Sequence, residues 1–330
     1  MPASVLIDTD PGIDDAVALA LAAKLPELRI VGITTSHGNT DVDRATRNAR
    51  LIASIAGIDA PVTSGAAAPI ARDARPARET HGPEGLGHVI PVHPAEHEAD
   101  GAADAIIAQV RGKRKLAMCC LGPLTNLATA LAFAPDIADA LGTVFVMGGA
   151  LGVPGTQTAR SEFNWWSDPE AADFVLRAHL DLRLVPLDVT RRIAIPGSAI
   201  RALAEAGESD PQARFWADAL RFYADFHKEY EHFDGCVVND ALAVALVADP
   251  SLAGWEEMRL EVSLSDDDMR GAVERAPRGA HVAVATTVRA TDVLALLERM
   301  VFAPWLAPGS LASGAADAEG WLAREARART

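Results

Sequence analysis

The sequence predicts an α/β fold, a single large domain with a mainly parallel central sheet and helices on both faces. Two observations lead to this prediction. Short apolar runs alternate along the chain with segments of helical periodicity, and the runs are apolar almost throughout. Such runs are typical of parallel strands that are buried on both faces. A third observation sets the number of domains, because no linker-like break and no internal repeat divides the 330 residues.

The expected elements follow one another in regular order. The first strand is predicted at 4–8, followed by a helix with apolar residues at helical spacing: Ile13, Val17, Ala20 and Leu21. A strand at 29–35 precedes a helix over about 41–56. Further strands are predicted at 115–122, 143–149 and 180–188. Late strands, expected to be antiparallel, are predicted at 258–265 and 281–288. We divide the chain into a domain of residues 1–307 and a C-terminal helix or partly mobile tail at 308–330.

Two long segments with little periodicity, at 65–98 and 148–164, are interpreted as loops. Long irregular loops inside a compact domain are usually functional. In open α/β sheets such loops gather at the carboxyl ends of the strands, where ligands bind. We therefore expect both loops to border a ligand site.

Composition restricts the class of partner and the setting. The formal net charge of −15 argues against nucleic acid and against an anionic membrane surface. The adjacent Cys119 and Cys120 lie in an apolar run and are expected to be reduced core residues. No apolar stretch reaches the ~18 residues needed to span a bilayer, and the N-terminus enters a strand at once. These features predict a cytoplasmic, soluble protein.

The stretch "DTDPGIDDA" places Asp8, Asp10, Asp14 and Asp15 at the junction of the first strand and helix. Charges near a helix N-terminus account for Asp14 and Asp15, but not for Asp10 across a tight Pro-Gly turn. Carboxylates that converge without a counter-charge have raised pKa values. A hard divalent cation removes this conflict, and oxygen ligands favour calcium or magnesium.

Two other carboxylate motifs were considered for this stretch. An EF-hand does not fit, because a helix begins where that loop needs further ligands. A phosphatase-type nucleophile at Asp8 or Asp10 remains open, although no lysine or glycine-rich cradle for a phosphate follows.

The segment "DTDPGIDDAVAL" resembles the signature of the nucleoside hydrolases, the inosine–uridine preferring family. The similarity continues in order through "HGNT" (37–40), "HGPEGLG" (81–87), "LGPLTNLA" (121–128), "VFVMGGA" (144–150), "EFNWWSDPEAA" (162–172), "VPLDVT" (185–190) and "NDALAVA" (239–245). The resemblance covers most of the chain. It implies a Rossmann-like core and a calcium-dependent hydrolysis of ribonucleosides to ribose and a free base.

The resemblance also implies roles for individual residues. Calcium would be held by Asp10, Asp15 and Asp240, together with the backbone carbonyl of Thr125. Asp10 would also act as the general base toward water held by the ion, and Asp14 would bind ribose hydroxyls. Different roles for the adjacent Asp14 and Asp15 agree with helix geometry, because side chains at adjacent helix positions diverge by about 100°. Asp8 has no such role and is expected to brace the turn.

Further ribose contacts are implied for Asn39, Glu162 and Asn164. Two positions depart from the family pattern. Thr156 stands where many members have an asparagine on the 5′ side of the sugar, so contact with the 5′-hydroxyl is expected to change. Asn239 stands where a histidine often precedes the late calcium ligand, and its amide cannot act as an acid. Asn239 is therefore grouped with the substrate-binding residues.

The missing histidine leaves the leaving-group acid to be found. His81 matches a family histidine beside the base and is our candidate, with a pKa expected near neutrality. The segment 222–233 adds His227, Tyr230 and His232 near the same region. Each is interpreted as a helix-surface residue and is the alternative acid if His81 is not.

Two alternatives to a ribonucleoside hydrolase stay open. One is a calcium-dependent nucleoside- or ribose-binding protein with little catalysis, and the other an N-glycosidase for another ribosyl compound. The resemblance further implies a homodimer or homotetramer. It does not indicate the preferred base.

Overall fold

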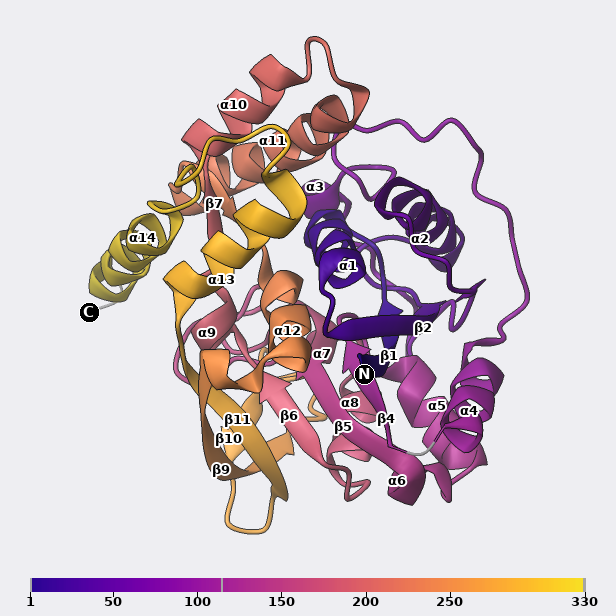
Figure 1. The fold of residues 1–330 in the computed structure, drawn as a ribbon. Coiled ribbons are helices and arrows are strands. Elements are labelled where there is room, and N and C mark those ends of the chain that lie inside the picture. The colour runs from indigo at the N-terminus through magenta and orange to yellow at the C-terminus, as the bar shows by residue number, and fades with distance from the viewer. Residues whose placement is uncertain (1, 114, 329–330) are drawn as a thin grey trace.

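The computed structural model describes residues 2–113 and 115–328, and within them a sheet of nine strands forms the centre of the molecule (Figure 1). Across the sheet the order is β10 (Val273–Arg275), β9 (Ala253–Val262), β11 (Ala280–Val288), β6 (Leu182–Val185), β5 (Leu141–Met147), β4 (Leu116–Cys120), β1 (Ala3–Thr9), β2 (Leu28–Thr35) and β3 (Val62–Thr63). The pairs from β11 to β3 are parallel. The mainly parallel sheet is confirmed.

The late strands agree only in part with the expected antiparallel direction. β9 pairs antiparallel with both β10 and β11. β11, however, pairs parallel with β6, so it continues the main sheet. Only β9 reverses direction, because it lies antiparallel between the edge strand β10 and β11, which both run in the direction of the main strands.

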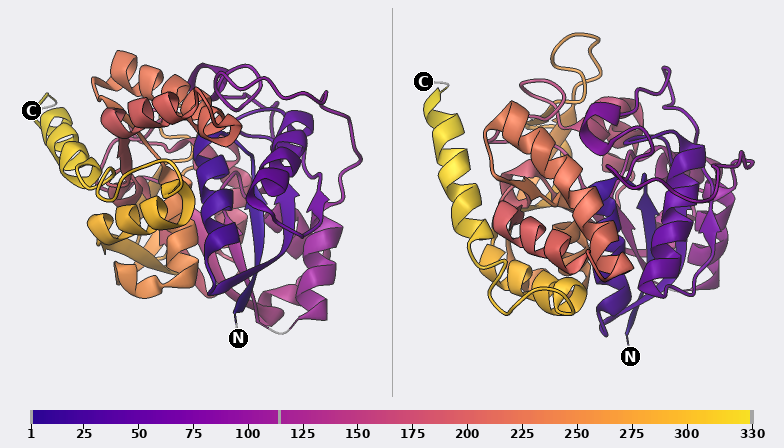
Figure 2. Two further views of the ribbon diagram at one scale, coloured as in Figure 1. Left: turned by 45° about the horizontal axis from the view of Figure 1, so that its top comes forward. Right: turned by 90° about the horizontal axis from the view of Figure 1, so that it is seen from above.

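Helices cover both faces of the sheet (Figures 1 and 2). One face carries α1 (Ile13–Lys24), α2 (Val42–Ala56), α10 (Gly197–Ala206), α11 (Pro211–Glu231), α12 (Asn239–Ala248), α13 (Ala290–Leu297) and the π-helical turn η2 (Glu298–Phe302). The other carries α4 (Ala102–Gly112), α5 (Thr125–Phe133), α6 (Ile137–Ala140) and α8 (Pro169–Leu176). A 3₁₀ turn, η1 (Pro250–Leu252), joins α12 to β9. None of the helices in the described residues is long and apolar enough to cross a membrane.

The alternation of side chains along β1 explains why its sequence is apolar throughout. Val5 and Ile7 pack into the core beneath α1 and α12, while Leu6 packs into the core on the side of α4 and α5. Successive strand residues point to opposite faces, so a strand covered on both sides needs apolar residues at every position. Cys119 and Cys120 divide between the two cores in the same way and are free thiols.

A smaller pair of strands, β7 (Ala194–Pro196) and β8 (Gly235–Val237), lies beside the main sheet. The C-terminal helix α14 (Gly314–Ala328) packs near β7 and α13 and runs along one side of the molecule (Figure 2). Its Trp321 is 1% exposed and packs with Phe233 and Val237. The last helix is thus anchored by an apolar contact of its own.

Candidate active site

Four aspartates converge at the carboxyl ends of the parallel strands. Asp10 follows β1, and Asp14 and Asp15 occupy the first turn of α1. α12 packs against α1 and brings Asp240 from its own first turn. One carboxylate oxygen from each of Asp14, Asp15 and Asp240 lies within 4.8 Å of the others. Asp10 borders this group, since the charges of Asp15 and Asp14 both raise its pKa.

Neighbouring backbone makes room for the carboxylate of Asp10. A Cβ atom at Gly38, after β2, or at Gly122, after β4, would overlap that carboxylate. The backbone N–H of Asn39 donates a hydrogen bond to Asp10 Oδ2 at 2.7 Å. Asp10 Oδ1 is buried and has no hydrogen-bond partner among the described residues. The backbone therefore holds Oδ2, and the lone pairs of Oδ1 are available to a ligand or a proton.

Hydrogen bonds hold Asp15 firmly in place. Its Oδ2 accepts from the backbone N–H of Gly12 and from the side-chain amide of Asn39, each at 2.9 Å. The hydroxyl of Thr9 donates to Oδ1. The amide of Asn239 reaches the other neighbour, Asp14 Oδ2, at 3.4 Å. Asn39 and Asn239 therefore each position one carboxylate of the group.

Burial raises the pKa of each carboxyl in the group, and repulsion by neighbouring carboxylates raises it further for Asp10, Asp14 and Asp240. For Asp14 burial and the charge of Asp15 raise the pKa to about 7, from the ordinary value of 3.8. The pKa values of Asp10 and Asp240 are raised well above that value for the same two reasons. The buried Asp14 Oδ1 has no hydrogen-bond partner in the described chain. Uncompensated negative charge and free carboxylate oxygens fit a divalent cation.

Asp8 takes no part in this group. Its Oδ1 accepts from the hydroxyl of Thr34 on β2 at 2.6 Å and from the side-chain amide of Asn126 on α5 at 2.8 Å. Asp8 therefore ties β1 to β2 and α5 rather than bracing the turn that follows β1. Burial raises its pKa to about 6.

Thr125 lies buried at the start of α5. Its hydroxyl donates to Asp168 at 2.6 Å and contacts His37 Nε2 at 3.0 Å. Its backbone carbonyl accepts from Thr129 at 2.7 Å. A carbonyl oxygen has a second lone pair, so the expected ligand role of this carbonyl stays a prediction.

A cavity of about 480 Å³ opens beside the aspartates. The predicted site residues in its lining are Asp14, Asn39, His81, Thr156, Glu162, Asn164, Asn239 and Asp240. Asp14 lies on α1, and Asn239 and Asp240 lie on α12; the others come from loops and from the short helices α3 (Arg78–His81) and α7 (Phe163–Ser167). Both long loops predicted from the sequence supply lining residues.

Glu162 and Asn164 are fixed by the geometry of α7. Glu162 is the N-cap and accepts from the backbone N–H groups of Asn164 at 2.7 Å, Trp165 at 3.1 Å and Gly149 at 3.0 Å. Asn164 Nδ2 donates to the backbone carbonyl of Leu121 at 2.6 Å, which leaves its Oδ1 as acceptor. Both residues are buried, as their apolar flanks led us to expect. Thr156 is exposed, and its hydroxyl accepts from Phe163 N–H at 3.0 Å.

His81 lies in the cavity wall, but its expected pKa near neutrality is wrong. Burial, together with His227, lowers the pKa of His81 to about 3. Its Nδ1 accepts the backbone N–H of Ile13 at 3.2 Å, so the neutral ring carries its hydrogen on Nε2. Burial lowers this pKa because a charged imidazole loses its hydration in the interior. The sequence does not show that His81 is buried.

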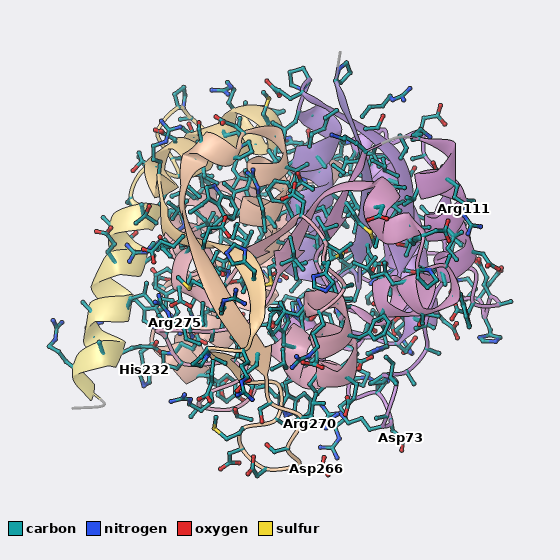
Figure 3. All side chains as sticks on the ribbon, turned by 90° about the horizontal axis from the view of Figure 1, so that it is seen from below. Asp73, Arg111, His232, Asp266, Arg270 and Arg275 are labelled. Carbon is teal, nitrogen blue, oxygen red and sulfur yellow. The ribbon has the colours of Figure 1, made fainter. Side chains whose placement is uncertain are left out.

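The three residues of 222–233 interpreted as surface residues divide into two classes. Tyr230 is 64% exposed, and His232 is exposed at the end of α11, at the periphery in Figure 3. These two interpretations are confirmed. His227 is only 4% exposed and lines the cavity, so its interpretation as a surface residue is wrong. It points inward with Tyr223, one helical turn earlier.

Tyr223, Arg191 and Trp321 also line the cavity and were missed from the sequence. Tyr223 and His227 lie at i and i+4, so helical periodicity could have paired them. Arg191 follows α9 (Leu187–Thr190), and Trp321 belongs to α14. No local pattern connects these two residues, which lie far apart in the chain.

Comparison with known proteins decides the family. The model of the inosine-uridine preferring nucleoside hydrolases matches residues 5–295. The chain belongs to the nucleoside hydrolase family. It is 35% identical to the inosine-uridine preferring nucleoside hydrolase of Leishmania major, over 80% of this chain and 85% of that protein. It is 30% identical to a probable uridine nucleosidase of Oryza sativa subsp. japonica, over 91% and 97%.

Solved structures of nucleoside hydrolases share the fold. A plant nucleoside hydrolase superimposes with a TM-score of 0.85 at 32% identity, covering 92% of this chain and all of the other. The purine-preferring ribonucleoside hydrolase of Gardnerella vaginalis gives a TM-score of 0.82 at 29% identity. The chain is therefore an N-glycosidase of the class that hydrolyses ribonucleosides, and its acidic group can hold a metal ion.

Proposed function

We propose that this nucleoside hydrolase uses calcium to cleave ribonucleosides into ribose and a free base. The observation that carries the proposal is the group of buried carboxylates Asp14, Asp15 and Asp240, within 4.8 Å of one another at the wall of the cavity. Oxygen-only donors favour a hard cation such as calcium. Asp10, Asp15, Asp240 and the carbonyl of Thr125 are the proposed ligands. Calcium, when bound, would orient water and lower its pKa.

Asp10 is proposed as the general base that takes a proton from the attacking water. Its Oδ1 has no hydrogen-bond partner in the described chain, so a lone pair is available. Its pKa, raised by burial and by Asp15, makes the carboxylate a stronger base than an exposed aspartate. Oδ2 remains held by Asn39 N–H at 2.7 Å, which fixes the orientation of the group.

Ribose binding is assigned to Asp14, Asn39, Glu162 and Asn164, whose side chains line the cavity. Asp14 Oδ1 and Asn164 Oδ1 can each accept a hydrogen bond from a sugar hydroxyl. The negative charge around the sugar would stabilise the oxocarbenium-like transition state of glycosidic cleavage. Thr156 is proposed to give a weaker contact on the 5′ side, since its hydroxyl already accepts from Phe163 N–H.

Two residues are proposed to face the leaving base. His81, neutral with its hydrogen on Nε2, would donate a hydrogen bond rather than act as a charged acid. Asn239 accepts from the hydroxyl of Thr190 at 2.8 Å and donates to Asp14, so it would fix the carboxylate that binds ribose.

We also propose a cytoplasmic homodimer or homotetramer. The formal charge of −15 argues against nucleic acid or an anionic membrane as a partner.

A panel of purine and pyrimidine ribonucleosides, assayed for reducing sugar with and without a strong chelator, tests the proposal. Ribose should be released from at least one ribonucleoside, chelation should abolish release, and calcium should restore it. Binding of nucleosides without any release would instead support the calcium-dependent binding protein. Release only from ribosyl compounds outside the panel would support an N-glycosidase with another substrate.

A further inference from the structure

A second group of charged side chains borders the active-site cavity. It comprises His227 and Glu231 on α11, Arg191 after α9, and Glu325 on α14. Glu231 Oε1 lies 3.5 Å from the guanidinium of Arg191, and Glu231 Oε2 lies 3.8 Å from His227 Nε2. Glu325 lies 3.2 Å from Arg191. The first three line the cavity, whereas Glu325 stands behind Arg191.

The hydrogen bonds of His227 determine where its protons lie. Nδ1 is 2.8 Å from the backbone carbonyl of Tyr223, which can only accept, so Nδ1 carries a hydrogen. Nε2 therefore has a lone pair when the ring is neutral, and that lone pair faces the carboxylate of Glu231. Glu231 Oε2 is buried and has no hydrogen-bond partner among the described residues. A proton on Nε2 would turn this repulsive arrangement into an attractive one.

The charge of the group leads to the same conclusion. Arg191 contributes one positive charge, and Glu231 and Glu325 contribute two negative charges. With neutral His227 the group has an uncompensated negative charge, and with protonated His227 it is balanced. Arg191 is 5% exposed, so solvent screens these charges little.

α14 supplies the second carboxylate and holds Arg191 in place. The guanidinium lies 4.7 Å from the ring centroid of Trp321, and Trp321 Nε1 donates to the backbone carbonyl of Glu231 at 3.0 Å. Glu325 is nearer to Arg191 than Glu231 is. Because Glu325 neutralises Arg191, the charge of Glu231 remains available to His227. α14 begins at Gly314, beyond residue 295 where the family match ends.

We propose that His227 protonates the leaving base, and that α14, through Glu325, offsets the charge of Arg191 that disfavours a proton on His227 Nε2. The proposal rests on the proposed hydrolysis of ribonucleosides. As the C1′–N bond breaks, its electron pair goes to the base nitrogen, which takes the Nε2 proton of His227. Water adds to C1′ and loses a proton to Asp10. Solvent then reprotonates His227 and removes the proton from Asp10, so the sum is nucleoside plus water to ribose plus base.

Other titratable groups near His227 act in both directions. Tyr223 and Glu231 face it from its own helix, His81 from α3 and Arg191 from the end of α9. The pKa of His227 lies below its ordinary value: burial lowers it most, Glu231 and the backbone carbonyl of Tyr223 raise it, and Arg191 lowers it further. Glu231, Arg191 and Glu325 are positioning residues in this scheme, and of these four charged groups His227 alone is proposed to contact the base.

The first experiment compares two leaving groups in His227→Gln. A natural ribonucleoside needs a proton on its base, whereas p-nitrophenyl riboside releases a stable anion without one. General acid catalysis contributes typically about 10²–10⁴-fold, so kcat for the nucleoside should fall by that factor, with little change for p-nitrophenyl riboside. His88→Gln is the matched control, since His88 is exposed and contacts Phe222 on the same helix. Equal losses on both substrates would overturn the proposal.

The second experiment tests α14 through a residue outside the cavity. In Glu325→Gln, Arg191 has only Glu231 as an anionic partner, so the pKa of His227 should fall. The high-pH limb of kcat for nucleosides should therefore move to lower pH, while the profile for p-nitrophenyl riboside should not move. Glu319→Gln is the matched control on α14, because Glu319 is exposed and, within the described residues, its ion pair is with Arg192 at 3.6 Å.

The outcomes separate this proposal from the proposed function. An unchanged pH profile in Glu325→Gln, or equal shifts in the two α14 variants, would refute the role of α14. No ribose release by the wild-type enzyme from any ribonucleoside would refute the proposed function itself. If His227→Gln does not fold, Glu325→Gln still tests the scheme, since its side chain keeps the same size.

Discussion

Trp321 should anchor the C-terminal helix, and its replacement offers a quantitative test of that contact. The ring is 1% exposed, lies 5.3 Å from Phe233 and is covered by the guanidinium of Arg191 at 4.7 Å. Large-to-small replacement of a buried tryptophan costs ~3–5 kcal/mol. Loss of the Nε1 hydrogen bond to Glu231 adds about 1 kcal/mol. Trp321→Ala should thus destabilise the docked helix by about 4–6 kcal/mol.

Trp321→Phe separates the two contributions, because it keeps most of the ring and removes the N–H donor. We expect it to cost about 1–2 kcal/mol. Urea unfolding and limited proteolysis of α14 measure the global and local effects, and Arg324→Ala, at an exposed position of α14, is the control. A cost below about 1 kcal/mol for Trp321→Ala, with α14 still resistant to protease, would refute this account of how α14 is anchored.

Asp10→Ala should abolish turnover and weaken calcium binding, as measured by ribose release and calorimetric titration; full activity would exclude Asp10 as the base. Calcium affinity should fall as the pH drops, because burial raises the pKa values of the proposed ligands Asp10, Asp15 and Asp240 and protons then compete with the ion. Titrations at a series of pH values check this, and equal affinities would contradict it. Ribonucleosides should exceed 2′-deoxynucleosides in kcat/KM by orders of magnitude, since a site built for a hydroxyl rejects analogues that lack it. Discrimination against 5′-deoxy analogues should be milder because Thr156 offers no amide, and strong discrimination would point to another 5′ contact.

Much of the fold could be predicted because its signals are local. A strand buried on both faces must be apolar at every position, as β1 is between its two cores. The aspartate stretch after β1 was also informative, because crowded carboxylates must be explained by a counter-charge wherever the chain goes. The sequence alone supported a cation near Asp10, Asp14 and Asp15. Asp240 joined that prediction only through the resemblance to the nucleoside hydrolases.

Tertiary packing decided which faces of the later helices meet the cavity. Helical periodicity relates Tyr223 to His227, but it does not say that this pair is buried while Tyr230 faces solvent. The pKa of His81 likewise depends on burial, a property of the assembled fold. Arg191 and Trp321 are joined only when α14 packs beside the end of α9. Contacts of this kind depend on the shape of two surfaces far apart in the chain, and hydrophobic pattern alone does not encode which surfaces meet.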